Sequence, residues 1–188
     1  MIKLKNKYYI MRHGQAISNV RDVCSCWPEK FYNHLTKLGI KMVKESAEKL
    51  KNKNINYIFC SPLLRTRNTA EIVGKSLKIK PKIDRRLREQ NSGIFNGRPF
   101  EELSAFFGEK RLDRFKLRPP KGETYIEIEK RMLKFLKSTD KKYKNKTILI
   151  VSHELPLLFL DCAVKGIKNS DFYVSRKKIS TAEERELN

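Results

Sequence analysis

The sequence lacks the features that mark a membrane protein or a secreted protein. It contains no apolar run of about 18 residues, which a transmembrane helix requires. Its basic N-terminus carries an apolar stretch too short for a signal peptide, and no small-residue cleavage pattern follows it. We therefore expect a soluble cytoplasmic protein that makes no contact with a membrane.

Patterns for metal binding, thiol redox chemistry and nucleotide binding are also missing. The chain has no H-x-H, D-x-D or C-x-x-C pair and no P-loop glycine pattern. A cytoplasmic setting favours reduced thiols for its four cysteines, which are Cys24, Cys26, Cys60 and Cys162. The sequence gives no reason to expect a metal ion or a cofactor.

Acidic residues are scarce, with 21 Asp and Glu against 42 Lys and Arg, which gives a net charge of +21. The excess is spread along the chain, because the segments 1–60, 61–120 and 121–188 carry +8, +8 and +5. A surface of this charge attracts nucleic acid non-specifically and attracts small phosphorylated molecules equally well. Charge alone therefore does not decide between these partners.

Length and hydrophobic periodicity predict a single α/β domain over residues 1–188. Strand and helix patterns alternate, which favours a three-layer sandwich with a mostly parallel central sheet and helices on both faces. The predicted strands span 8–11, 57–60, 82–87 and 147–151, with a possible edge strand at 178–180. The predicted helices span 37–50, 65–76, 99–107, 123–138 and 156–164.

Chemically active side chains follow the predicted strands. In such folds the site lies beyond the carboxyl ends of the strands, so these residues should meet at one edge. Arg provides bidentate phosphate donors, neutral His is a competent nucleophile, and a carboxylic acid can protonate a leaving oxygen. Phosphoryl transfer without a metal is the chemistry that this set favours. The residues concerned are Arg12, His13, Arg65, Glu89 and His153.

The ordered motifs resemble those of the histidine phosphatase superfamily, the phosphoglycerate mutase-like group, along most of the chain. The matching segments are Arg12-His13-Gly14 with Asn19, Leu35-Thr36 to Gly39, Ser61-Pro62-Leu63-Leu64-Arg65, Leu87-Arg88-Glu89 with Gly93 and Gly97, Gly122-Glu123-Thr124, and Ser152-His153. The resemblance implies a phosphoglycerate mutase-like fold, with a small helical insertion or lid at about 98–121.

The resemblance also implies a role for each site residue. His13 would form the phosphohistidine, and Asn19 would add a hydrogen bond to the transferred phosphoryl group. Glu89 would be the general acid and later the base that activates water. The residues that would hold the phosphoryl group are Arg12, Arg65 and His153. Substitutes for Glu89 remain open among Glu101, Glu102, Glu109 and Glu123.

Nearby charges lead to two pKa expectations. Glu89, beside two arginines and two histidines, should have a depressed pKa in the empty site. His13 must be neutral to attack phosphorus, and the neighbouring Arg12 and Arg65 disfavour its protonated form.

The chain departs from the family pattern after the second histidine, where Glu154 stands in place of the usual Gly. Its side chain would either crowd the phosphate and add negative charge, or point away. Phe95, Asn96 and Ala16 also replace more frequent residues. These differences bear on the substrate more than on the class of reaction.

Three functions remain open. The first is a metal-independent phosphatase for a small phosphomonoester, and the second is a phosphoglycerate mutase, which the short segment between Gly97 and Gly122 disfavours. The third is a retired enzyme that binds phosphate or nucleic acid, for which no aromatic-interleaved basic motif is present. Sugar phosphates, nucleotides and phosphoproteins are all possible substrates, and the oligomeric state cannot be read from the sequence.

Overall fold

The computed structural model describes residues 2–108 and 111–188. Within this part of the chain, one five-stranded sheet has the order β3-β2-β4-β1-β5. Its strands are β1 (Lys7–Arg12), β2 (Tyr57–Cys60), β3 (Lys82–Ile83), β4 (Thr147–Ser152) and β5 (Glu184–Glu186). The contacts between β1, β2, β3 and β4 are parallel, and only β5 pairs antiparallel, with β1.

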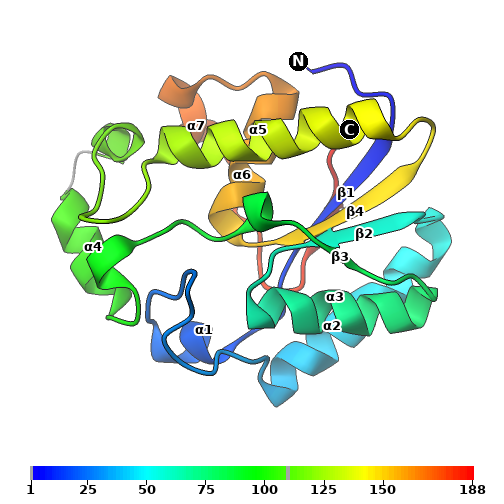
Figure 1. The fold of residues 1–188 in the computed structure, drawn as a ribbon, viewed down its shortest axis with the longest axis horizontal. Coiled ribbons are helices and arrows are strands. Elements are labelled where there is room, and N and C mark those ends of the chain that lie inside the picture. Colours follow the sequence, from blue (N-terminus) through cyan, green and yellow to red (C-terminus); the bar gives the residue numbers. More distant parts are fainter. Residues whose placement is uncertain (1, 109–110) are drawn as a thin grey trace.

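Helices cover both faces of the sheet, as Figure 1 shows, with α2 and α3 below it and α5 and α6 above it. The helices are α1 (Ile17–Arg21), α2 (Lys37–Leu50), α3 (Leu64–Leu77), α4 (Phe100–Phe107), α5 (Tyr125–Lys142), α6 (Glu154–Lys165) and α7 (Phe172–Ser175). Short 3-10 turns span Lys51–Lys53, Arg85–Leu87, Gly93–Phe95, Arg111–Phe115 and Asn169–Asp171. The predicted mostly parallel α/β sandwich is confirmed.

Alternating strand residues divide the core into two layers. Tyr8 and Ile10 of β1 belong to the apolar cluster beneath α5 and α6, whereas Tyr9 and Met11 belong to the cluster with α2 and α3. Every residue of β4 after Thr147 is buried, as expected for a central strand covered on both sides. The sheet is therefore a rigid base for the loops at its carboxyl edge.

Close packing of α2 against the loop after β1 explains one of the glycine positions. Thr36 caps α2, because its Oγ1 accepts a hydrogen bond from the Gly39 backbone N–H at 2.9 Å. A Cβ on Gly39 would lie 2.0 Å from the Gln15 carbonyl oxygen, so no larger residue fits there. This contact holds the segment that follows His13 against the helix.

Two predicted strands are wrong in extent or place. The strand predicted at 82–87 ends at Ile83, because the Asp84 carboxylate accepts a hydrogen bond from Arg86 N–H and starts a 3-10 turn. The edge strand lies at Glu184–Glu186 rather than 178–180. Its E-R-E sequence has no apolar alternation that could have indicated a strand.

Two predicted helix starts are off by two residues. The helix predicted from 123 to 138 begins later, at Tyr125 with Thr124 as its N-cap, and extends to Lys142. The other predicted start is too late. Helix α6 begins at Glu154, with His153 as its N-cap, rather than at Pro156. Pro156 falls in the first turn, where a missing N–H breaks no helical hydrogen bond.

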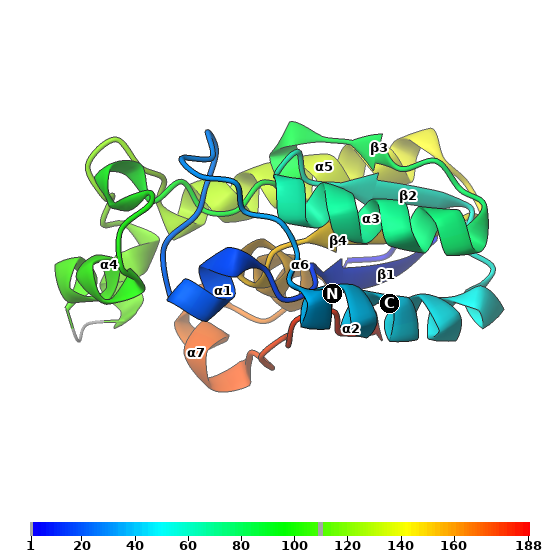
Figure 2. The same cartoon turned by 90° about the horizontal axis from the view of Figure 1, so that it is seen from below.

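The segment predicted as an insertion contains α4 and the turn at Arg111–Phe115, while residues 109–110 lie outside the described part of the chain. Figures 1 and 2 both show α4 projecting beyond the carboxyl ends of the strands. Leu103 and Phe107 of α4 form a small apolar cluster with Cys24 and Phe95. Among the described helices, none is long and apolar enough to cross a membrane.

Candidate active site

A cavity of about 480 Å³ lies at the carboxyl edge of the sheet. Arg12 at the end of β1, His13 just after it, and Arg65 in the first turn of α3 line this cavity. Glu89 and Asn19 line it as well. The structure thus brings five of the six predicted site residues to one cavity. The sixth, His153, is fully buried and contacts Arg65 and His13.

His13 is held in one tautomer by its neighbours. Its Nδ1 lies 2.8 Å from the Gly14 carbonyl oxygen, which only accepts hydrogen bonds, so Nδ1 carries the proton. Its Nε2 accepts a hydrogen bond from Arg65 Nε at 3.0 Å, so this nitrogen is unprotonated and its lone pair faces Arg65. Burial, followed by the positive charges of Arg65 and Arg12, holds the pKa of His13 well below its usual 6.5. The ring is neutral near pH 7, as expected.

Arg65 connects both histidines to the loop that follows α1. Its Nη2 donates to His153 Nδ1 at 2.9 Å and to the Ser25 carbonyl oxygen at 3.0 Å, and its Nη1 donates to Ser25 Oγ at 3.2 Å. Burial lowers the pKa of Arg65 to about 10, so it remains a cation near pH 7. The guanidinium is thus fixed in place before any ligand arrives.

His153 is fixed in the opposite tautomer. Its Nδ1 accepts from Arg65, so the proton lies on Nε2, which is 2.9 Å from Ser61 Oγ. Burial, then the charge of Arg65, holds its pKa well below 6.5. The rings of His13 and His153 meet edge to face, with centroids 5.2 Å apart. Two neutral imidazole rings are therefore in direct contact at this edge of the sheet.

Glu89 departs from the expected pKa. Its Oε1 accepts from the Gln90 backbone N–H at 2.8 Å, and its Oε2 lies 3.9 Å from His153 Nδ1. Burial raises the pKa of Glu89 above its usual 4.5, although Arg65 acts in the opposite direction. The prediction of a depressed pKa was wrong, because it counted the nearby cations and not the loss of water around the carboxyl group.

The other carboxylates considered for the role of general acid are less well placed than Glu89. Glu101 and Glu102 lie on α4 and do not line the cavity, and Glu109 lies outside the described residues. Glu123 is engaged by the Arg131 guanidinium, at 2.8 Å from Nε and 3.0 Å from Nη2.

Glu154 points toward the site. Its Oε2 accepts a hydrogen bond from Arg12 Nη1 at 2.5 Å, and both residues line the cavity. Arg12 Nη1 also donates to the Ile179 carbonyl oxygen at 2.8 Å. Of the two alternatives for Glu154, the structure supports the one that adds negative charge to the phosphate pocket.

Asn19 is exposed, and its Oδ1 accepts from the Ala16 backbone N–H at 2.9 Å, which makes it a cap for the short helix α1. Its amide N–H₂ group remains available to donate hydrogen bonds to a ligand.

Arg114, in the turn at Arg111–Phe115, also lines the cavity. Sequence reasoning missed Ser25, from the loop after α1, and two more cations in the lining, Arg176 and Lys178. They come from irregular segments, where no spacing rule places a side chain. Among the described residues, no group of three His, Cys, Asp or Glu side chains is arranged to hold a metal ion.

Comparisons with known proteins place the chain among its relatives. The chain is 29% identical over 163 residues to a probable phosphoglycerate mutase, GpmB, of Yersinia pestis (strain Pestoides F), covering 85% of this chain and 74% of the relative. Its structure resembles that of YhfR of Bacillus stearothermophilus with a TM-score of 0.82 and 24% identity, covering 96% and 90% of the two chains.

It also resembles a mycobacterial glucosyl-3-phosphoglycerate phosphatase solved with VO3, with a TM-score of 0.79 and 20% identity, covering 96% and 90% of the two chains. At these identities, the two solved structures establish a shared fold. The sequence profile of the histidine phosphatase superfamily (branch 1) matches residues 8–182. Because this match spans nearly the whole chain, the protein belongs to the histidine phosphatase superfamily.

Proposed function

We propose that the protein is a metal-independent phosphatase that hydrolyses a small phosphomonoester through a phosphohistidine at His13. One observation carries the proposal: the proton of His13 is on Nδ1, against the Gly14 carbonyl oxygen, and the lone pair of Nε2 faces Arg65. A nucleophile and a cation for the phosphoryl oxygens are thus joined in one contact.

In the first step, Arg65 Nε gives up its hydrogen bond to His13 Nε2 and donates to a phosphoryl oxygen instead. His13 Nε2 then attacks phosphorus and the ester P–O bond breaks. Protonated Glu89 gives its proton to the leaving oxygen, so the alcohol departs neutral and the phosphoryl group stays on His13. Arg12 and Arg65 balance the charge on the phosphoryl oxygens, and His153 contributes through its neutral ring and its contact with Arg65. The raised pKa of Glu89 favours the protonated form that this step needs.

In the second step, the Glu89 carboxylate takes a proton from water while the water oxygen attacks phosphorus. The P–N bond to His13 breaks, inorganic phosphate leaves, and Glu89 is protonated again. Asn19 has its amide N–H₂ group available for a phosphoryl oxygen.

The experiment is hydrolysis of para-nitrophenyl phosphate at pH 5–8 with EDTA present. Wild type should turn over, and His13→Ala should lose at least about a thousandfold in kcat, since removal of a nucleophile leaves only binding effects. His34→Ala is the matched control, because His34 does not line the cavity. Loss of wild-type activity in EDTA would contradict the metal-independent mechanism.

A mutase is the second candidate, because the curated relative at 29% identity is named a probable phosphoglycerate mutase. It would return the phosphoryl group from His13 to an alcohol instead of to water. Phosphoryl transfer that requires 2,3-bisphosphoglycerate and outpaces release of inorganic phosphate would favour this candidate. Salt-dependent retention of nucleic acid without turnover of any phosphomonoester would favour a binding protein.

A further inference from the structure

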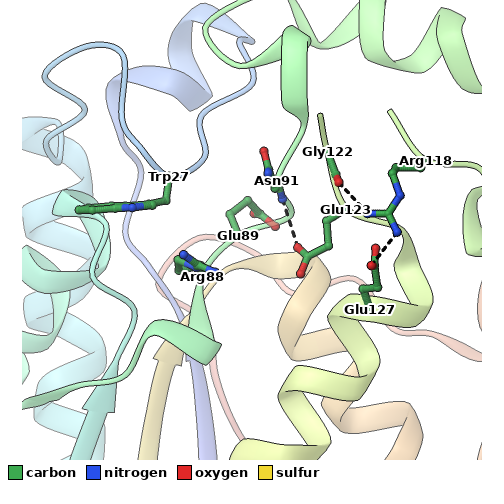
Figure 3. A pocket seen from close by; sticks show the side chains of 8 residues that line it. All are labelled: Trp27, Arg88, Glu89, Asn91, Arg118, Gly122, Glu123 and Glu127. Atoms are coloured by element: carbon green, nitrogen blue, oxygen red, sulfur yellow. Dashed lines mark hydrogen bonds and ion pairs between the residues drawn. The ribbon is translucent and has the colours of Figure 1, made fainter. Parts of the chain in front are cut away.

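A second cavity, of about 250 Å³, shares a wall with the active site. Among the residues that line the two cavities, Glu89 alone belongs to both. Figure 3 shows Glu89 near the middle of this second cavity, between Trp27 on one side and Arg118 with Glu127 on the other. Because Glu89 lines both cavities, an ester oxygen protonated by Glu89 allows the phosphoryl group to lie in the first cavity and the alcohol part to extend toward the second.

One wall of the second cavity is formed by Trp27 and Arg88. Trp27 is the only tryptophan of the chain, and 43% of its surface is exposed, which is unusual for an aromatic group of this size. Arg88 is half-buried, and its guanidinium makes no hydrogen bond or ion pair with another described residue. In Figure 3 the unpaired guanidinium of Arg88 lies near Glu89, and the indole of Trp27 lies farther to the left, at the edge of the same cavity.

The opposite wall consists of charges that neutralise one another. Arg118 contacts the Glu127 carboxylate at 2.7 Å and the Gly122 carbonyl oxygen at 3.0 Å. Glu123 is engaged by Arg131 and by the Asn91 backbone N–H at 3.2 Å. A carboxylate has about four lone-pair positions, so these paired groups keep acceptor capacity without a large net charge.

We propose that the second cavity binds the alcohol part of the substrate and that this alcohol is a sugar or a ring-sized polyol. Its hydroxyl groups would donate to the carboxylates of Glu123 and Glu127 and accept from Arg88. Its C–H face would lie on the indole of Trp27. This inference rests on the proposed phosphatase function, because it places the ester oxygen at Glu89.

The size and composition of the cavity support a small polar ligand. Its volume is below the range of about 300–1,000 Å³ for typical ligand pockets, so it suits one ring and not a peptide segment. Because most charged groups that line the second cavity are paired, the lining suits hydroxyl groups better than a second phosphate group.

The test compares glucose 6-phosphate and ribose 5-phosphate with cyclohexylmethyl phosphate, a ring-containing phosphate that has no hydroxyl groups. We expect kcat/KM to favour the better sugar phosphate by at least about tenfold, since a site built to bond hydroxyl groups rejects the analogue that lacks them. Arg88→Ala and Trp27→Ala should abolish this preference. Arg85→Ala is the matched control, because Arg85 is exposed and lines neither cavity. It should keep the preference.

Binding is measured separately, so that failure of catalysis is not mistaken for failure of the site. In the His13→Ala variant, Trp27 fluorescence should report tighter binding of the sugar phosphate than of cyclohexylmethyl phosphate, and Arg88→Ala should remove the difference. Equal affinities, or a stronger preference for 3-phosphoglycerate through its carboxylate, would overturn the inference. Hydrolysis of para-nitrophenyl phosphate in the same preparation would then leave the phosphatase function standing.

Discussion

Arg12 donates a hydrogen bond to the Glu154 carboxylate at 2.5 Å, at the point where a phosphoryl group would need the same guanidinium. Glu154 is also the first residue of α6, where a helix N-terminus favours negative charge. A phosphate that enters the cavity must therefore compete with a carboxylate of the protein itself for Arg12. This competition weakens the binding of substrate phosphate and of product phosphate alike.

Glu154→Gln should bind inorganic phosphate about fivefold more tightly than wild type, because a partly exposed ion pair is worth about 1 kcal/mol. Isothermal titration with phosphate at pH 7 measures the change. Glu48→Gln is the control, since it removes the same charge from the exposed ion pair with Lys51. Equal phosphate affinity in all three proteins would show that Glu154 does not compete.

Glu89→Gln should lower kcat by about a hundredfold or more, which is the usual contribution of general acid catalysis. The loss should be larger for an alkyl phosphate than for para-nitrophenyl phosphate, because the alkoxide needs the proton more. In wild type, kcat/KM should fall with rising pH as Glu89 of the free enzyme loses its proton, and the raised pKa of Glu89 places this fall above pH 4.5.

The alkaline fall in kcat/KM should be absent in Glu89→Gln and present in the control Glu101→Gln, whose position on α4 is outside the cavity lining. An unchanged pH–rate profile in Glu89→Gln would remove Glu89 from the role of general acid.

Sequence patterns located most of the site because its residues follow regular elements. Arg12 ends β1 and His13 follows it, Arg65 lies in the first turn of α3, and His153 follows β4. The parallel arrangement of these strands alone brings the four residues to one edge. The contact between Arg12 and Glu154 was not predictable, because spacing does not determine where a side chain points. The pKa of Glu89 was predicted with the wrong sign, because burial is not visible in a list of neighbouring charges.

The irregular segments account for the remaining differences. The antiparallel strand β5 pairs through backbone groups, and its polar sequence carries no strand pattern. Arg176 and Lys178 reach the cavity from the segment before β5, which has no periodicity to place them.

The two buried histidines should make folding stability depend on pH. Both have lowered pKa values in the folded protein and the ordinary value of about 6.5 when unfolded. Below pH 6.5 the unfolded chain takes up protons that the folded protein does not, so stability falls as the pH decreases. Each histidine contributes about 1.4 kcal/mol per pH unit in this window.

Urea unfolding at pH 7, 6 and 5 measures this slope. Glu89 works in the opposite direction, because a raised carboxyl pKa lowers stability as the pH rises. The informative quantity is therefore the change in the free energy of unfolding per pH unit, compared between wild type and His153→Asn. This slope should be shallower in His153→Asn. His34→Asn is the control and should keep the wild-type slope. A parallel slope in His153→Asn would contradict the burial of a neutral His153.

Asp140 should matter for stability and not for catalysis. Its buried carboxylate, on α5, accepts hydrogen bonds from the backbone N–H groups of Lys5 and Asn6, from Asn6 Nδ2 at 2.9 Å and from the Tyr8 hydroxyl at 3.2 Å. Asp140→Ala leaves these donors unpaired in a buried place, so we expect a loss of about 3 kcal/mol in the free energy of unfolding.

These donors lie at the start of β1, about 16 Å from its catalytic end at the usual rise per residue. Well below its melting temperature, Asp140→Ala should thus keep the kcat of wild type, while urea unfolding shows the loss of stability. Asp171→Ala, whose carboxylate bonds only the exposed Ser170 hydroxyl among the described side chains, should change neither quantity. A fall in kcat with the fold intact would instead show that the start of β1 influences the position of Arg12 and His13.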